Sequence, residues 1–355
     1  MEEGEQAPRW RRRETPYQRW QKEEGIPVVA GSYVGDLYST EVAPWPRIGQ
    51  AGAFVNLADQ EQDDGWVIEI APGGQTEVLH HFFEASTYIL TGHGATTFWQ
   101  EGHPKQTVEW GRGSLFSPPL NCYYQHFNHD GQHPARMFTV TNAPMMINLM
   151  RSVDWVFGDS YVFADRYDGR ENYFTDPGKR ITKREWATNF VPDVRTFTLE
   201  DNPGRGIGNV RMGFAMAGNQ LAAHMSEFPS GHYKQGHWHG VGAHVIILSG
   251  QGYSLLWFDG EERRKVDWKD GSVLSPKEGE WHQHFNTGQE SSRYLAIRLG
   301  GLDTNWSSRA PAEAGFYSGI AYDHEDPAIY DLYASECTRN GAKVVMPRPN
   351  YVATG

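Results

Sequence analysis

The sequence predicts an all-β protein that contains two copies of one barrel-forming module. The 355-residue chain repeats itself at an offset of 158 residues, and convincing helical periodicity is scarce. Its apolar residues fall in short β-branched and aromatic runs, such as VIILSG and SLLWF, that are bounded by glycine-containing turns. Turn signals at ~8–12-residue spacing are typical of sandwiches and barrels.

The repeat aligns residues 69–128 with residues 227–286 without a gap, and 20 of the 60 aligned positions are identical. TYILTGHGATTFW (87–99) lies over VIILSGQGYSLLW (245–257), and QHFN occurs in both copies. Chance does not place so many glycines, prolines and tryptophans in one register. We therefore expect two domains, 1–165 and 191–355, joined by a polar, glycine-bearing linker at 166–190.

The segments outside the repeat carry several aromatic residues, and we expect them to pack over the barrels as extra strands and arms. Short helices are predicted at 17–24, within the linker at 183–189, and at 327–337. The fold class is therefore all-β, with short helices in the arms and the linker.

The composition excludes several classes of function. Lys and Arg total 32 against 44 Asp and Glu, so the net charge of −12 argues against general affinity for nucleic acid or anionic membranes. No apolar run approaches the ~18 residues of a membrane span, and the charged N-terminal segment does not resemble a signal peptide. Two cysteines, Cys122 and Cys337, are too few for a disulfide framework, which favours a cytoplasmic location.

The second copy carries histidines in a spacing that suits a metal. Five residues separate Gly231 from His237, Trp238 and His239, and a later segment contains Gly271, Pro276, Gly279, His282 and Asn286. Histidines at i and i+2 of one strand point to the same face, and a third from a neighbouring strand completes a facial set. Three imidazoles on rigid strands leave coordination positions open for substrate, water or O2.

These two segments resemble the paired motifs of the cupin superfamily, which implies two cupin jelly-roll barrels and a divalent metal on His237, His239 and His282. The glutamate usual in that pattern would stand at position 243, which is Ala243, and His244 follows it. Strand alternation favours three histidine ligands, with His244 as an alternative fourth ligand. In the first copy Leu79 and Tyr124 replace two of the ligands, so we expect that barrel to hold no metal.

Among two-barrel cupins, HWHGVGAHVIILSGQGY (237–253) is similar to a stretch of the gentisate, salicylate and 1-hydroxy-2-naphthoate dioxygenases. That resemblance implies Fe(II), O2 and a small hydroxylated aromatic or carboxylate substrate. His284 lies two residues beyond His282 on the same face, so it is either a candidate catalytic acid/base or a core histidine. Arg298 is either a candidate catalytic residue that binds a substrate carboxylate or part of a solvated strand face. The candidate lining residues of the substrate pocket are Trp238, Trp257 and Arg293.

Two other functions remain open at this point. The same barrel with Zn(II), Mn(II) or Ni(II) suits a non-oxidative isomerase, lyase, decarboxylase or hydrolase. The third reading is a bicupin that binds a metal or ligand without catalysis. In each case we expect a small-molecule ligand, no nucleic-acid or membrane partner, and a homo-oligomer that covers exposed strand edges.

Overall fold

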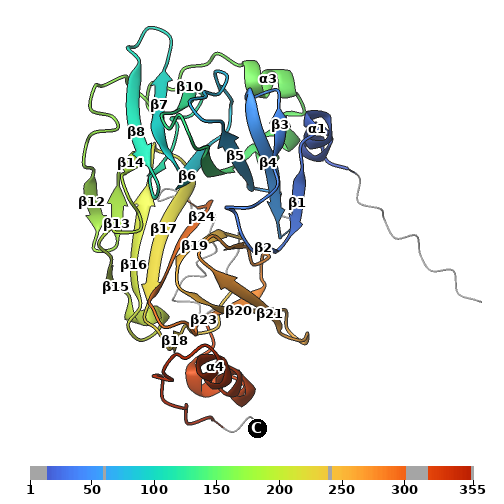
Figure 1. The fold of residues 1–355 in the computed structure, drawn as a ribbon, viewed down its shortest axis with the longest axis vertical. Coiled ribbons are helices and arrows are strands. Elements are labelled where there is room, and N and C mark those ends of the chain that lie inside the picture. Colours follow the sequence, from blue (N-terminus) through green and yellow to red (C-terminus); the bar gives the residue numbers. More distant parts are fainter. Residues whose placement is uncertain (1–13, 59–60, 239–241, 301–318, 353–355) are drawn as a thin grey trace, which may run out of the picture.

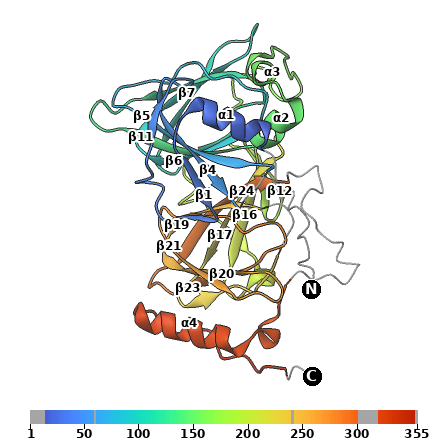
Figure 2. The same cartoon turned by 90° about the vertical axis from the view of Figure 1, so that its right-hand side faces the viewer.

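The computed structural model describes residues 14–58, 61–238, 242–300 and 319–352. It places two β-barrels one above the other along the long axis of the molecule, with a C-terminal helix beneath the second barrel (Figure 1). Figure 2 shows that three further helices cover one side of the first barrel. No helix among the described residues is long and apolar enough to cross a bilayer.

The first barrel consists of two facing sheets. The larger sheet has the strand order β1-β4-β5-β11-β6-β9-β14 with β3 beside β4, and the smaller has the order β10-β7-β8. Their bounds are β1 Val28–Gly31, β3 Ala43–Trp45, β4 Gln50–Leu57, β5 Asp64–Ile70, β6 Ala85–Thr91, β7 His93–Trp99, β8 Gln106–Gly111, β9 Leu115–Phe116, β10 Tyr123–Asn128, β11 Ala135–Thr141 and β14 Phe190–Val191.

The second barrel repeats this plan. Its larger sheet has the order β12-β13-β16-β17-β24-β19-β22-β2 with β15 beside β16, and its smaller sheet has the order β18-β23-β20-β21. Their bounds are β2 Tyr33–Val34, β12 Lys179–Thr182, β13 Glu185–Ala187, β15 Glu200–Asp201, β16 Val210–Ala215, β17 Leu221–Phe228, β18 His232–Tyr233, β19 His244–Ser249, β20 Gln251–Trp257, β21 Arg264–Lys269, β22 Val273–Leu274, β23 Trp281–Asn286 and β24 Ser292–Leu299.

The glycine pairs of the repeat are explained by the close approach of neighbouring strands. A Cβ at Gly94 would lie 2.0 Å from the carbonyl oxygen of Phe127, and a Cβ at Gly252 would lie 1.9 Å from that of Phe285. Both contacts are far shorter than any real Cβ tolerates. The second glycine of the GxG pattern in each copy is therefore required by the pairing of β7 with β10 and of β20 with β23.

The two barrels exchange one short strand each. Strand β2, from the N-terminal arm, pairs with β22 of the second barrel, whereas β14, from the segment between the copies, pairs with β9 of the first. The pairs Val34 with Val273 and Val191 with Leu115 occupy equivalent positions of the repeat. The two barrels are therefore not made of two consecutive chain segments, because β2 and β14 each belong to the barrel of the other segment.

One apolar core lies between the barrels and belongs to both. Side chains of the larger sheet of the first barrel, among them Tyr88 and Phe138, pack with Met225, Ile246 and Leu295 of the second. All five are fully buried. Because the outer face of each large sheet is covered by the other barrel, the two modules form one continuous structure.

Two of the three predicted helices are present. Helix α1 (Pro16–Glu24) begins with a capping box between Thr15 and Gln18, and α4 (Pro327–Arg339) begins at Asp326, whose side chain accepts a hydrogen bond from the amide of Ala328. Helices α2 (Ala143–Met150) and α3 (Val153–Gly158) were not predicted.

The helix predicted at 183–189 is wrong, because this segment forms the turn after β12 and then strand β13. Strand β13 runs parallel to β16, with Trp186 opposite Phe214. The Trp186 indole packs edge-on against Phe197, at a centroid distance of 6.1 Å. Tertiary pairing therefore overrides the weak local helical propensity of this segment.

Candidate metal and substrate site

His237 and His282 face each other across a β-bridge in the second barrel. The amide of His237 donates to the carbonyl of His282 (3.0 Å), and the amide of His282 donates to the carbonyl of His237 (2.8 Å). The centroids of their rings are 4.2 Å apart. In the first barrel Leu79 and Tyr124 form the same bridge with hydrogen bonds of 2.7 and 2.9 Å. The sequence repeat therefore matches equivalent positions in space.

Both imidazoles are held by backbone carbonyls. His237 Nδ1 lies 3.1 Å from the carbonyl oxygen of Gln235, and His282 Nδ1 lies 3.0 Å from that of Glu280. A carbonyl can only accept, so each Nδ1 carries the proton and each Nε2 presents a lone pair. This outer hydrogen bond is the usual way in which a metal-binding histidine is oriented.

His284 belongs to a hydrogen-bonded chain that both barrels contain. Trp268 Nε1 donates to Ser254 Oγ (3.0 Å), and Ser254 Oγ lies 2.7 Å from His284 Nδ1. The Ser254 hydroxyl therefore links the indole of Trp268 to the imidazole of His284. The first barrel repeats this chain with Trp110, Thr96 and His126 at 2.9 and 2.7 Å. His284 is thus a part of the shared scaffold as well as a candidate hydrogen-bond donor.

A buried lysine lies beside the histidines, and sequence reasoning missed it. Lys234 is 3% exposed, and its Nζ donates to Ser226 Oγ (2.7 Å) and to Tyr294 Oη (2.9 Å). The Tyr294 ring is 5.8 Å from the ring of His284 and 6.1 Å from that of His224. Strand alternation of 222–228 could have placed His224 and Ser226 on one face, but no sequence signal marked Lys234 as buried.

Arg298 shares a sheet face with these groups. On β17 and β24, Ser226 lies opposite Tyr294 and Ala222 lies opposite Arg298. Because alternate residues of a strand face the same side, Arg298 is on the face of β24 that carries Tyr294. The catalytic role of Arg298 stays a prediction, and its charge also acts on Asp63, where it partly offsets the rise in pKa that burial causes.

His244 does not belong to this group, and the alternative of a fourth ligand is not supported. Its ring is fully buried on the opposite face of β19 from Val245, and its Nδ1 lies 3.4 Å from Oδ1 of Asp63 in the first barrel. Burial lowers the pKa of His244 to about 4 and raises the pKa of Asp63 to about 7. Ala243 packs with Val245 in the apolar cluster on the interior side, where the usual glutamate would stand.

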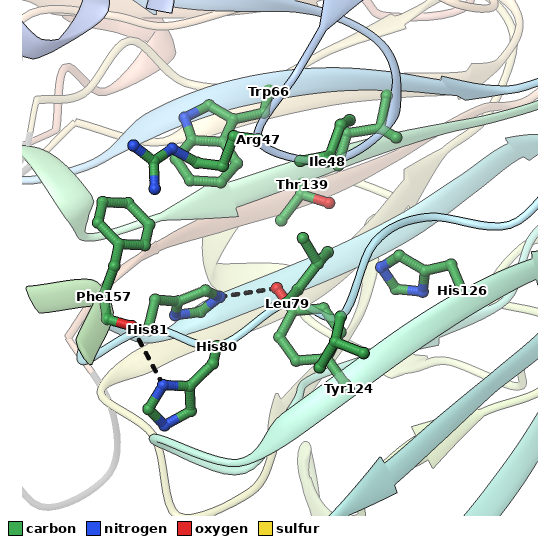
Figure 3. A pocket seen from close by; sticks show the side chains of 12 residues that line it. Arg47, Ile48, Trp66, Leu79, His80, His81, Tyr124, His126, Thr139 and Phe157 are labelled. Carbon is green, nitrogen blue, oxygen red and sulfur yellow. Dashed lines mark hydrogen bonds between the residues drawn. The ribbon is translucent and has the colours of Figure 1, made fainter. Parts of the chain in front are cut away.

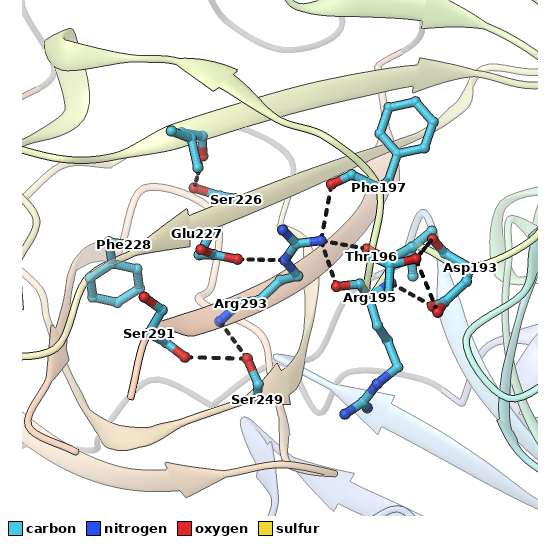
Figure 4. Close-up of polar contacts among 12 residues, drawn as sticks. Asp193, Arg195, Thr196, Phe197, Ser226, Glu227, Phe228, Ser249, Ser291 and Arg293 are labelled. Carbon is cyan, nitrogen blue, oxygen red and sulfur yellow. Dashed lines mark hydrogen bonds and ion pairs between the residues drawn. The ribbon is translucent and has the colours of Figure 1, made fainter. Parts of the chain in front are cut away.

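Arg293 is structural, contrary to its predicted place in a substrate pocket. Its Nε donates to Glu227 (2.6 Å), and its Nη1 donates to the carbonyls of residues 194, 195 and 197 at 2.7–3.1 Å (Figure 4). Arg136 of the first barrel does the same with Glu69 and with the carbonyls of residues 37 and 40. Each arginine therefore binds, through backbone carbonyls, a segment that crosses from the other barrel, residues 194–197 in one case and 37–40 in the other.

The predicted pocket tryptophans also lie elsewhere. Trp257 packs on the outer face of the smaller sheet in the cluster that α4 covers, and it stacks at 6.2 Å on Trp281. The ring of Trp238 is 6.5 Å from that of Trp281. Alternation along β20 and β23 puts these rings outside and the histidines inside.

His239, the third predicted ligand, lies outside the described residues. Within the described part of the chain, no cluster of three or more His, Cys, Asp or Glu side chains is arranged to hold a metal. The donor chemistry of His237 and His282 nevertheless fits a divalent ion, because both Nδ1 atoms are protonated and held by carbonyls.

Comparisons with known proteins identify the architecture. This chain is similar to an oxalate decarboxylase whose structure concerns the substrate binding mode and a switch of reaction specificity. The match covers 90% of this chain and 88% of that chain, with a TM-score of 0.53 and 13% sequence identity. The Bacillus subtilis oxalate decarboxylase structure at pH 4.6 matches 77% of each chain with a TM-score of 0.51 at 14% identity. The chain has the bicupin fold. No family model and no curated protein sequence matches it.

This likeness confirms the predicted pair of cupin barrels. At such low sequence identity the similarity shows the bicupin fold alone, so any chemistry has to be argued from the residues of the site. A similarity to the gentisate dioxygenase group is not among these findings.

Proposed function

We propose that the second barrel is a metal-dependent lyase that releases CO2 from a small carboxylic acid without net oxidation. The observation that carries this proposal is the placement of the His237 and His282 imidazoles in the same barrel interior as the buried Lys234–Tyr294 pair. The printed name of the structural neighbours, oxalate decarboxylase, adds support for this reaction class.

His237, His239 and His282 would hold the ion, with His239 included on the sequence motif alone because it lies outside the described residues. A divalent ion bound there supplies Lewis-acid stabilisation of negative charge on the substrate. Three neutral imidazoles leave the full charge of the ion in place, which favours an anionic substrate. Mn(II), Fe(II), Zn(II) and Ni(II) all accept imidazole ligands.

Lys234 and Arg298 would bind and orient the carboxylate. The ammonium of Lys234 is held by Ser226 and Tyr294 in a buried position, where an ion pair with a substrate carboxylate is screened little by water. Arg298 lies at the end of the same sheet face, one pair of cross-strand positions beyond Ala296. A guanidinium binds a carboxylate through two parallel hydrogen bonds.

His284 would supply the proton. When the bond to the carboxylate breaks, CO2 leaves and its bonding electron pair stays on carbon, so that carbon must gain one proton. The Ser254 hydroxyl holds the ring of His284 through Nδ1 at 2.7 Å, and the ring lies 5.6 Å from that of His282. A histidine within reach of the reacting carbon suits this transfer.

The test combines metal analysis with a product assay. The full chain is loaded with each divalent metal and incubated with oxalate and with other short-chain carboxylic acids, while CO2 release and O2 consumption are followed together. CO2 release without net O2 consumption is expected, and His282→Ala should abolish both the bound metal and the release. The exposed His133→Ala is the matched control and should change neither. Absence of CO2 with every metal and acid would overturn the proposal.

A second candidate, an Fe(II)-dependent dioxygenase for hydroxylated aromatic acids, is favoured by one observation. Ala243 occupies the position of the usual carboxylate ligand, as in the three-histidine group that 237–253 resembles. Stoichiometric O2 uptake with hydroxybenzoates and Fe(II), without CO2 release from simple acids, would replace the lyase by this function.

A further inference from the structure

The first barrel contains a cavity that the metal chemistry of the second barrel does not use. Its volume is about 170 Å3, and it lies between the sheets where the second barrel carries its histidines (Figure 3). It opens beside Val78, which is 47% exposed, and beside the partly exposed Arg47. The lining is mainly apolar and includes Ile48, Trp66, Ile68, Leu79 and Phe157.

One wall of this cavity carries a histidine, His126, that has a hydrogen-bond donor without a partner among the described residues. Thr96 Oγ1 accepts from Trp110 Nε1 and has no acceptor for its own proton among the described residues other than His126 Nδ1. His126 therefore carries its ring proton on Nε2. His126 is only 1% exposed, and no described residue accepts a hydrogen bond from this Nε2. This Nε2 is not among the inaccessible side-chain atoms that lack a partner, so a ligand or a solvent molecule in the cavity can reach it.

A hydrogen-bond acceptor lies next to this donor. His81 Nδ1 donates to the carbonyl of Phe83 (2.8 Å), so His81 Nε2 must accept, and its donor is the hydroxyl of Tyr124 at 2.7 Å. The Tyr124 oxygen thus gives its proton to His81 and keeps its lone pairs for the cavity. The rings of Tyr124 and His126 are 5.3 Å apart, and both residues line the same cavity.

The cavity carries no net charge. Burial lowers the pKa of both His81 and His126 to about 3, so both rings are neutral at pH 7. Arg47, the cation at the mouth, is held by Glu24 through its Nε at 2.8 Å and lies over the ring of Phe157 at 4.1 Å. Among the described side chains that line the cavity, none is acidic. A charged ligand would lose hydration without gaining a counter-charge.

We infer that the first barrel is a metal-free binding site for an uncharged single-ring molecule that carries one hydroxyl group, a simple phenol being the model ligand. The hydroxyl accepts from His126 Nε2 and donates to Tyr124 Oη, while the ring fills the apolar space between Trp66 and Leu79. A cavity of ~150 Å3 accommodates benzene in another protein, so the volume fits one ring.

The test is a calorimetric titration of the full chain with phenol, benzene and benzoate, before and after treatment with a chelator. Phenol should bind at one site in both states, with benzene and benzoate at least ~10-fold weaker, since they lack the hydroxyl or add a charge. Tyr124→Phe should weaken phenol binding at least ~5-fold, because the accepting oxygen is removed together with its hydrogen bond to His81.

The repeat supplies the matched control. His284→Phe alters the position of the second barrel that is equivalent to His126 and should leave phenol binding unchanged. Equal affinity for phenol and benzene, or no detectable phenol binding, would overturn the inference. Loss of phenol binding on chelation or in His284→Phe would assign the ligand to the second barrel and overturn it as well.

Discussion

The two barrels share their framework and differ in the side chains that face their interiors. Both contain the indole–hydroxyl–imidazole chain, with Trp110, Thr96 and His126 in one and Trp268, Ser254 and His284 in the other. Both fasten a crossing segment with an arginine that is paired to a glutamate. At the bridge, however, the first barrel has Leu79 and Tyr124 where the second has His237 and His282.

This comparison separates the residues that build a cupin barrel from those that give it chemistry. The bridge has the same backbone hydrogen bonds whether its side chains are a leucine and a tyrosine or two histidines. The barrel therefore does not need imidazoles at these positions in order to fold. The same positions carry two imidazoles in one copy and line a mainly apolar cavity in the other.

The largest effect is expected when the two bridge residues of the second barrel are replaced by those of the first. In the double variant His237→Leu with His282→Tyr, metal affinity should fall by at least ~100-fold, because only His239 of the proposed set remains. Circular dichroism should stay unchanged, since the first barrel accommodates the same pair. Elemental analysis of the purified variant measures the effect, and a stoichiometric metal content would contradict the ligand assignment.

An intermediate effect on stability is expected from the paired arginines. Arg136→Gln and Arg293→Gln each break a largely buried ion pair and release backbone carbonyls, so each should lower the free energy of unfolding by about 2–3 kcal/mol. Urea denaturation measures this. The two losses should be similar, and Arg293→Gln should leave the metal content unchanged. If Arg293→Gln instead lowered catalytic activity and left the free energy of unfolding unchanged, Arg293 would belong to the substrate site.

The smallest effect is expected at the buried Asp63–His244 contact between the barrels. The pKa of Asp63 is raised to about 7 in the folded chain, so the folded state binds its proton more tightly than the unfolded state. Its contribution to stability is therefore fully present below pH ~4 and is lost as pH rises through 7. Asp63→Asn should raise the free energy of unfolding by ~1–2 kcal/mol at pH 8 and by less at pH 5. A larger gain at pH 5 would show that the sign is wrong.

Much of the fold could be predicted because it depends on local sequence patterns. The 158-residue repeat, the GxG hairpins and the alternating strands predicted two barrels, and the capping residues predicted α1 and α4. The pair His237 and His282 also followed from spacing, since residue order along paired strands fixes which side chains meet. His239 remains a prediction that rests on that spacing.

Other features depend on contacts between segments that are far apart in the sequence. No local pattern shows that β2 and β14 exchange barrels, that Arg293 binds carbonyls of residues 194–197, or that Asp63 meets His244. The burial of Lys234 beside Tyr294 is of the same kind.

The sequence alone determined the module, its duplication and the asymmetry of the two bridges, because these depend on strand period, turn residues and spacing. The tertiary structure decided which polar side chains face an interior and which serve the joint between barrels. The physical reason is that burial and partner choice arise only when the two large sheets pack together. That packing determined the positions of His244 and Arg293 outside the site and that of Lys234 within it.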